Sequence, residues 1–251
     1  MTRRSTALIV ALAAACSSHK DPPAPGAGTG SNAASAVVVA PPDATPLQDH
    51  MHEHFESISE LQRAIARGHL DTAKVHAQWL IDHEVKLREG WPMLVDDMRV
   101  AAGEVVTAKD LPTAAVLAAR LGRTCSRCHD RQSAVVTFAW EPPPVDGPAL
   151  ATQMRRHQWA AARLWEGLVG PSDEMWSEGA SVLAKAKLDE VAAAGGMPRG
   201  DVFALAAKTR ELATRAMTID SGDERMTLYG ELLSTCAGCH ALVRPAPVPG
   251  P

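Results

Sequence analysis

Residues 51–65 read MHEHFESISELQRAI, and five of their side chains recur at steps of three and four residues. The five are Met51, His54, Ile58, Leu61 and Ile65. Such steps place side chains on one face of an α-helix, which can then pack against other helices. The stretch 154–168 repeats the same steps with Met154, His157, Ala161, Leu164 and Leu168. The chain is therefore predicted to contain two similar halves, each beginning with an amphipathic helix.

The rest of the chain extends this pattern. Four helical stretches are predicted between residues 48 and 131, and four more between about 149 and 242, with Gly- and Pro-containing breaks between them. Aromatic residues make up only 4 % of the chain, which argues against a β-sandwich or barrel. The predicted fold is all-α, with two tandem antiparallel four-helix bundles at 48–140 and 149–243 joined by a Pro-rich linker at 141–148.

Two pentapeptides carry the chemistry. Residues 125–129 read CSRCH and residues 236–240 read CAGCH, and each lies at the end of the last helix of its half. The C-x-x-C-H pattern is typical of covalent c-type haem attachment. Two thiols three residues apart lie on one helix face and can reach the two vinyl groups of one porphyrin, and the adjacent histidine can ligate the iron. The cysteines are Cys125, Cys128, Cys236 and Cys239, the iron ligands are His129 and His240, and the predicted cofactors are two haem c groups.

Three other uses of these cysteines are less consistent with the sequence. A shared zinc site does not explain why both distant cysteine pairs carry the histidine. A thioredoxin-type motif needs a βαβ setting, which the helical pattern does not provide. A disulfide between neighbouring cysteines is expected to be strained. The chain has five cysteines, and the fifth, Cys16, lies near the N-terminus.

The position of the two motifs resembles that in class II cytochromes c, the cytochrome c-prime group. These proteins are four-helix bundles with the C-x-x-C-H near the C-terminus, whereas small class I cytochromes c carry it near the start. The resemblance covers residues ~48–131 and ~149–243 and matches little beyond the motifs. It implies covalent haem at Cys125, Cys128, Cys236 and Cys239, with His129 and His240 as proximal ligands.

The second face of each iron is expected to meet the first helix of the same half, because the start of helix 1 lies beside the end of helix 4 in such a bundle. The candidates are Met51 or His54 for one haem and Met154 or His157 for the other, one of each pair. Low-spin class II relatives use a methionine here, and gas-binding relatives have no ligand. Ordinary packing in the core is the alternative role for these four side chains.

The N-terminus is predicted to be a secretory signal over residues 1–15, with Arg3 and Arg4 before an apolar stretch. Cys16 follows three alanines and resembles the lipidated cysteine of bacterial lipoproteins, although Ala13 stands where that family usually has leucine. The alternative is ordinary cleavage after Ala15. Residues 16–47 are predicted to form a disordered Pro/Ala/Gly tether, and 244–251 a disordered tail. The protein is thus expected on the periplasmic side of a bacterial membrane, held there only by a lipid.

The function predicted from these features is single-electron transfer between extracytoplasmic redox proteins, without substrate turnover. A formal net charge of −4 and the lack of a basic patch argue against a nucleic-acid partner. The alternative is NO or CO binding at a five-coordinate haem. His69, His76 and His83 recur every seven residues and are predicted to form a solvated stripe rather than a metal site, and His50 and His52 are expected at the surface.

Overall fold

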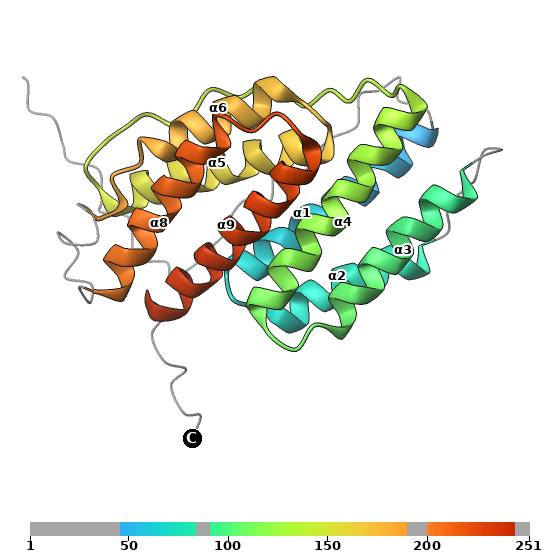
Figure 1. Cartoon of the computed structure of the whole chain (residues 1–251), viewed down its shortest axis with the longest axis horizontal. Coiled ribbons are helices and arrows are strands. Elements are labelled where there is room, and N and C mark those ends of the chain that lie inside the picture. The colour runs from blue at the N-terminus through green and yellow to red at the C-terminus, as the bar shows by residue number, and fades with distance from the viewer. Residues whose placement is uncertain (1–45, 84–90, 190–199, 244–251) are drawn as a thin grey trace, which may run out of the picture. The chain divides into compact units, whose positions relative to one another are not determined.

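The computed structural model describes residues 46–83, 91–189 and 200–243, and within these ranges it contains eight α-helices and no strand. The helices are α1 (Pro46–Ala66), α2 (Leu70–Asp82), α3 (Pro92–Thr107), α4 (Leu111–Gln132), α5 (Leu150–Val169), α6 (Asp173–Ala184), α8 (Asp201–Ala216) and α9 (Gly222–Val243) (Figure 1). The prediction of an all-α fold is confirmed. The expected signal peptide, Cys16, nearly all of the tether, and the tail lie outside the described residues.

Several helices begin at caps that the sequence encodes. The Asp110 side chain accepts a hydrogen bond from the backbone N–H of Thr113 at 2.8 Å, and Ser172 does the same for Met175 at the start of α6. Ser221 and Glu224 form a capping box at the start of α9, where the Ser221 hydroxyl accepts from the N–H of Glu224 at 3.2 Å. The Glu224 carboxylate accepts in turn from the Ser221 hydroxyl at 2.8 Å. These bonds satisfy N–H groups that a helix start leaves without intrahelical partners.

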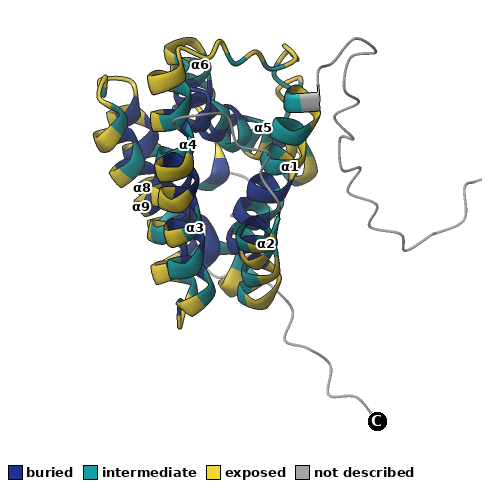
Figure 2. Cartoon of the chain, turned by 90° about the vertical axis from the view of Figure 1, so that its right-hand side faces the viewer, coloured by how far each residue is buried: buried dark blue, intermediate teal, exposed yellow. Residues whose placement is uncertain are grey.

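Helices that follow one another in the chain pack side by side. In the first half α1 contacts α2, α2 contacts α3 and α3 contacts α4, and the second half repeats this order with α5, α6, α8 and α9 (Figure 1). All of these helices belong to one compact unit, residues 38–251. Buried residues lie on the helix faces that are turned toward the interior, and exposed residues lie on the outer faces (Figure 2).

The two halves meet most extensively along α4 and α9. Val116 of α4 lies against Gly230 of α9, and Arg123 pairs with Asp223 at 2.8 Å, so the two helices run antiparallel. A Cβ added at Gly230 would lie 3.2 Å from the Cα of Val116, so the helices approach closely where the residue is small. This contact joins the two halves through one continuous core.

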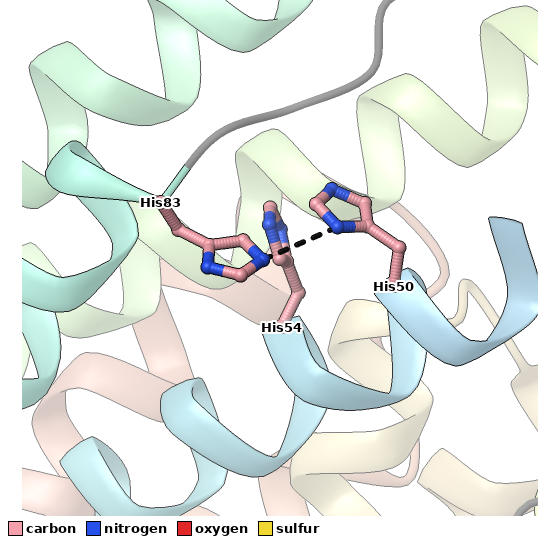
Figure 3. Close-up of side chains that lie close together, drawn as sticks. All are labelled: His50, His54 and His83. Atoms are coloured by element: carbon pink, nitrogen blue, oxygen red, sulfur yellow. Dashed lines mark hydrogen bonds between the residues drawn. The ribbon is translucent and has the colours of Figure 1, made fainter. Parts of the chain in front are cut away.

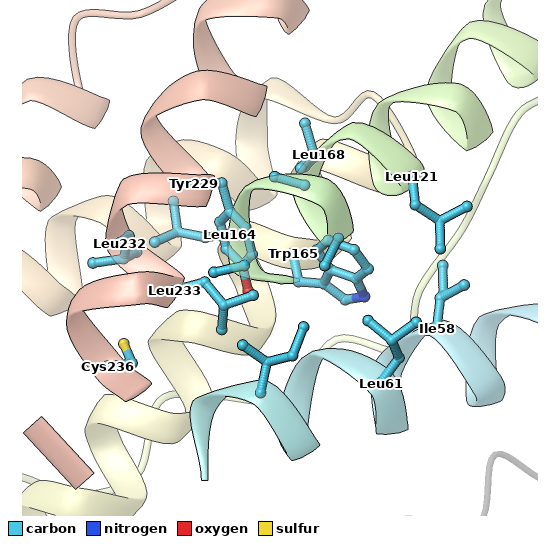
Figure 4. Close-up of a cluster of buried hydrophobic side chains, with 14 of the residues drawn as sticks. Ile58, Leu61, Leu121, Leu164, Trp165, Leu168, Tyr229, Leu232, Leu233 and Cys236 are labelled. Carbon is cyan, nitrogen blue, oxygen red and sulfur yellow. The ribbon is translucent and has the colours of Figure 1, made fainter. Parts of the chain in front are cut away.

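Trp165 of α5 occupies the centre of this core, close to Tyr229 of α9 with ring centroids 5.3 Å apart (Figure 4). Its side chain is among the largest fully buried ones in the described part of the chain. Leu61 of α1 and Leu121 of α4 belong to the same cluster, so all four helices contribute to it. A Cβ added at Gly122 would lie 2.8 Å from the Trp165 ring, and glycine at this position therefore lets the indole fit against α4.

We expect Gly122→Ala to destabilise the protein by about 1–3 kcal/mol, because the buried Trp165 ring must shift to admit the methyl group. Gly103→Ala is the matched control, since a Cβ at this mid-helix position of α3 meets nothing within 4 Å. That variant should be stabilised by about 0.4–1 kcal/mol through the lower entropy of its unfolded chain. Chemical denaturation of both variants measures the difference, and equal effects would contradict this account of the α4 packing.

The segment that contains the predicted linker is non-helical from residue 134 to 148 and is held against α5. Arg163 donates to the carbonyl of Ala139 at 2.9 Å, and Trp159 Nε1–H donates to that of Glu141 at 3.2 Å. Arg156 donates to the carbonyl of Pro144 at 2.6 Å. Three side chains of one helix thus satisfy backbone carbonyls of the connection between the halves.

Candidate functional site

The stretches 125–129 and 236–240 lie in the last three turns of their helices, α4 and α9. Cys125, Cys128, Cys236 and Cys239 are all free thiols, so neither pair forms a disulfide. The pKa of Cys125 and that of Cys236 are raised to about 12, mainly by burial and to a smaller extent by the second cysteine of each pair. The thiols are therefore protonated at neutral pH, which does not suit a nucleophilic or thioredoxin-type thiolate.

The histidines of the two motifs have equivalent environments, and each of them contacts a backbone carbonyl of the other half. Nδ1 of His129, in the first half, lies 3.0 Å from the carbonyl oxygen of Val169, the last residue of α5. Nδ1 of His240, in the second half, lies 2.6 Å from the carbonyl oxygen of Ala66, the last residue of α1. Each histidine thus reaches the end of the first helix of the other half.

These contacts determine the tautomer of the two imidazole rings. A carbonyl oxygen only accepts hydrogen bonds, so Nδ1 must carry the proton and donate it. In the neutral ring the lone pair then resides on Nε2, the atom that would ligate a metal. Burial lowers the pKa of His129 and favours this neutral form. Metal-ligating histidines commonly donate their other N–H to a backbone carbonyl, which fixes the ring orientation.

An apolar pocket of about 60 Å³ surrounds the second motif. Cys236, Cys239 and His240 line it from α9, and Met154 and His157 line it from α5. The Nε2 atom of His157 lies 3.9 Å from Sγ of Cys236, and its buried Nδ1 has no hydrogen-bond partner in the structure. Burial lowers the pKa of His157 to about 4, with a smaller effect from His240. The structure thus brings both distal candidates of the second half to the motif.

Three histidines of the first half form a separate cluster (Figure 3). His50 and His54 lie one turn apart on α1, and His83 follows the last residue of α2. The rings of His50 and His54 have centroids 4.4 Å apart, and those of His50 and His83 are stacked at 5.0 Å. The pKa of His54 is lowered to about 3, mainly by burial and to a smaller extent by the neighbouring His50, His83 and Arg99. A cluster of this kind can bind a metal ion.

This cluster corrects two expectations from the sequence. His83 does not share a solvated stripe with the exposed His69, because it turns toward α1, and His50 is half-buried against it rather than at the surface. The spacing of His50 and His54 by four residues already places both on one helix face. What the sequence does not contain is the position of His83, since that depends on how the end of α2 packs against α1.

Comparisons with protein-family models, with curated proteins and with solved structures give no match. The assignment of function therefore rests on the residues themselves. Among the described helices, none is both long and apolar enough to cross a membrane.

Proposed function

We propose that the chain is a dihaem c-type cytochrome that carries single electrons between redox proteins outside the cytoplasm. The observation that supports this most is the paired environment of His129 and His240, each with Nδ1 at hydrogen-bond distance from a backbone carbonyl. A structural histidine has no need to repeat this arrangement at two motifs, whereas an iron ligand needs Nε2 presented in a fixed direction. Each motif also supplies two free thiols for thioether bonds.

In this proposal the two halves are tandem four-helix units of the class II type, joined through α4 and α9. The donor set of each unit fits a haem, with two thiols and one imidazole at the end of a helix. The pocket of about 60 Å³ around the second motif is much smaller than the about 300–1,000 Å³ of ordinary ligand sites. Side chains that line this pocket from α5 and α8 must therefore move apart to admit a porphyrin.

Once bound, a haem supplies a one-electron couple between ferric and ferrous iron. The chain's own residues hold and tune this couple. The Val169 and Ala66 carbonyls orient the two imidazole rings, and the apolar lining of the second pocket would keep water away from a group bound there. In the second half His157 is the proposed distal ligand, since its Nε2 lies beside Cys236. In the first half His54 belongs to the histidine cluster, which leaves Met51 as the proposed distal ligand.

We further propose that the protein works on the periplasmic side of a bacterial membrane, where Cys16 carries a lipid. Its formal net charge of −4 suits redox partners with basic docking patches. Electron carriage rather than substrate turnover is the proposed role.

Haem content tests the proposal directly. The purified full chain should contain two haems by the pyridine haemochrome assay, and both should resist acid–acetone extraction because thioether bonds hold them. The double variant Cys236→Ser/Cys239→Ser should retain one haem, and Cys125→Ser/Cys128→Ser should retain the other. Extractable haem, or none, in the wild-type chain would disprove the assignment.

Cys16→Ser is the matched control for these variants, because it removes a cysteine outside both motifs. It should keep two haems and leave the membrane fraction for the soluble periplasmic fraction, as expected when the lipid-bearing residue is lost. A wild-type protein that is already wholly soluble after cell fractionation would contradict the proposed lipid attachment without affecting the haem assignment.

A further inference from the structure

The histidine cluster of α1 and α2 has the dimensions of a metal site. One ring nitrogen of each of His50, His54 and His83 lies within 4.8 Å of the other two. Nδ1 of His50 and Nε2 of His83 lie 3.3 Å apart (Figure 3). Four ligands at about 2.0–2.1 Å from a tetrahedral Zn²⁺ lie about 3.3–3.4 Å from one another. The separation of this pair therefore already equals one edge of a zinc coordination tetrahedron.

A fourth ligand, Glu53, is available on α1, the helix that also carries His50 and His54. Oε2 of Glu53 lies 3.2 Å from Nε2 of His83, which is again close to the edge of a tetrahedron. The Glu53 side chain is 56 % exposed, so the carboxylate can turn toward an ion without losing a buried partner. Three imidazoles and one carboxylate form a donor set that suits zinc.

The surroundings hold the rings in place. The Trp79 indole stacks on His83 with centroids 4.0 Å apart and meets His54 edge-on at 5.8 Å. Nε2 of His54 is buried and has no hydrogen-bond partner in the structure. Such an atom loses its hydrogen bonds to water on folding, and a metal ion would compensate for that loss. Arg99, the nearby cation, donates to the backbone carbonyl of His83 at 3.5 Å.

The second half lacks this arrangement. When Met51 and His54 are aligned with Met154 and His157, Gln153 corresponds to His50 and Ala186 corresponds to His83. His157 lies instead beside Cys236, at the C-x-x-C-H motif. The cluster is therefore a property of the first half alone, and it does not follow from the repeat that places the proposed haems.

We propose that His50, His54 and His83, with Glu53, form a binding site for one divalent transition-metal ion of the zinc type. No residue of the two C-x-x-C-H motifs belongs to this cluster. The metal would fasten the end of α2 to the N-terminal half of α1, because it would ligate residues from both.

Isothermal titration calorimetry with Zn²⁺ tests the proposal. The sample is the purified full chain, with whatever haem it carries. We expect one Zn²⁺ per chain, and a loss of affinity of about 100-fold or more in His83→Ala and in His50→Ala. His76→Ala is the matched control, because His76 lies on α2 but outside the cluster. The affinity of this variant for Zn²⁺ should equal that of the wild type. Binding that survives both cluster variants, or no binding at a ratio of one to one, would overturn the proposal.

X-ray absorption at the zinc edge separates this site from the cysteines. A shell of nitrogen and oxygen at about 2.0–2.1 Å supports the cluster, whereas a sulfur shell at about 2.3 Å would place the ion at a C-x-x-C-H motif and refute it. Far-ultraviolet circular dichroism of both cluster variants checks that they remain helical. Glu53→Gln provides a variant that keeps all three histidines and should bind about 10-fold more weakly.

Discussion

Replacing His157 with alanine should convert one of the two proposed haems from low-spin to high-spin and allow it to bind CO. The reason is the position of the ring, whose Nε2 lies 3.9 Å from Sγ of Cys236 in the pocket that His240 also lines. If the second motif carries a haem, His157 would offer the iron a second imidazole besides that of His240, and its removal would leave a position that a small gas could take. Visible and near-infrared spectra of the oxidised and reduced protein, with and without CO, measure the change.

Met154→Ala is the control for this result, because Met154 lies one turn earlier on the same face of α5 and lines the same pocket. Its spectrum should remain that of the wild type. If Met154→Ala rather than His157→Ala gives the high-spin spectrum and CO binding, methionine is the ligand in this half. A wild-type chain that is already high-spin and binds CO at both haems would favour the alternative function, NO or CO binding at a five-coordinate haem.

Arg163→Ala should destabilise the fold by about 3–5 kcal/mol. This side chain is only 5 % exposed and donates to the Glu166 carboxylate at 2.8 Å and to the Ala139 carbonyl at 2.9 Å. Its removal leaves the half-buried Glu166 carboxylate and the Ala139 carbonyl of the connecting segment without this donor. Arg155→Ala on the same helix is the control, because Arg155 is exposed, and it should change the free energy of unfolding by less than about 0.5 kcal/mol.

The loss of folding stability caused by Arg163→Ala should also grow as the pH rises. Burial raises the pKa of Glu166 from 4.5 to about 7, and Arg163 opposes this shift. Because the folded-state pKa lies above the unfolded value, the contribution of Glu166 to stability falls as pH rises from about 4.5 to about 7. Without Arg163 the folded pKa is higher still, so the decline continues to higher pH. Denaturant unfolding at pH 5 and pH 8 measures this, and an equal deficit at both values would contradict it.

The all-α character of the fold was predictable because it depends on local spacing. The steps of three and four residues from Met51 to Ile65 need only the geometry of one helix, and Ile58, Leu61 and Ile65 are indeed buried. The packing of α4 on α9 was not predictable in this way. It depends on a small residue that allows close approach, Gly230, and a glycine inside a helical pattern does not reveal which neighbour it admits.

The candidate site also has a part that the sequence predicts and a part that depends on how distant helices pack. The two motifs and the side chains that belong to them are visible in the sequence as pentapeptides. The carbonyls of Ala66 and Val169 that contact the motif histidines are not, because every residue has a carbonyl and only the packing of distant helices selects these two. His83 shows the same limit, since a seven-residue repeat placed it on a solvated stripe and the fold places it beside His50 and His54.

The crossed contacts of His129 with Val169 and of His240 with Ala66 have a consequence for any attempt to shorten the chain. A cut within residues 134–148 would leave each motif histidine facing a carbonyl that belongs to a different polypeptide. The two fragments would then need each other in the way that subunits of a dimer do, and neither fragment would orient its own imidazole. In this respect one covalent chain holds the equivalent of a two-subunit assembly, and its stoichiometry cannot change when the protein is diluted.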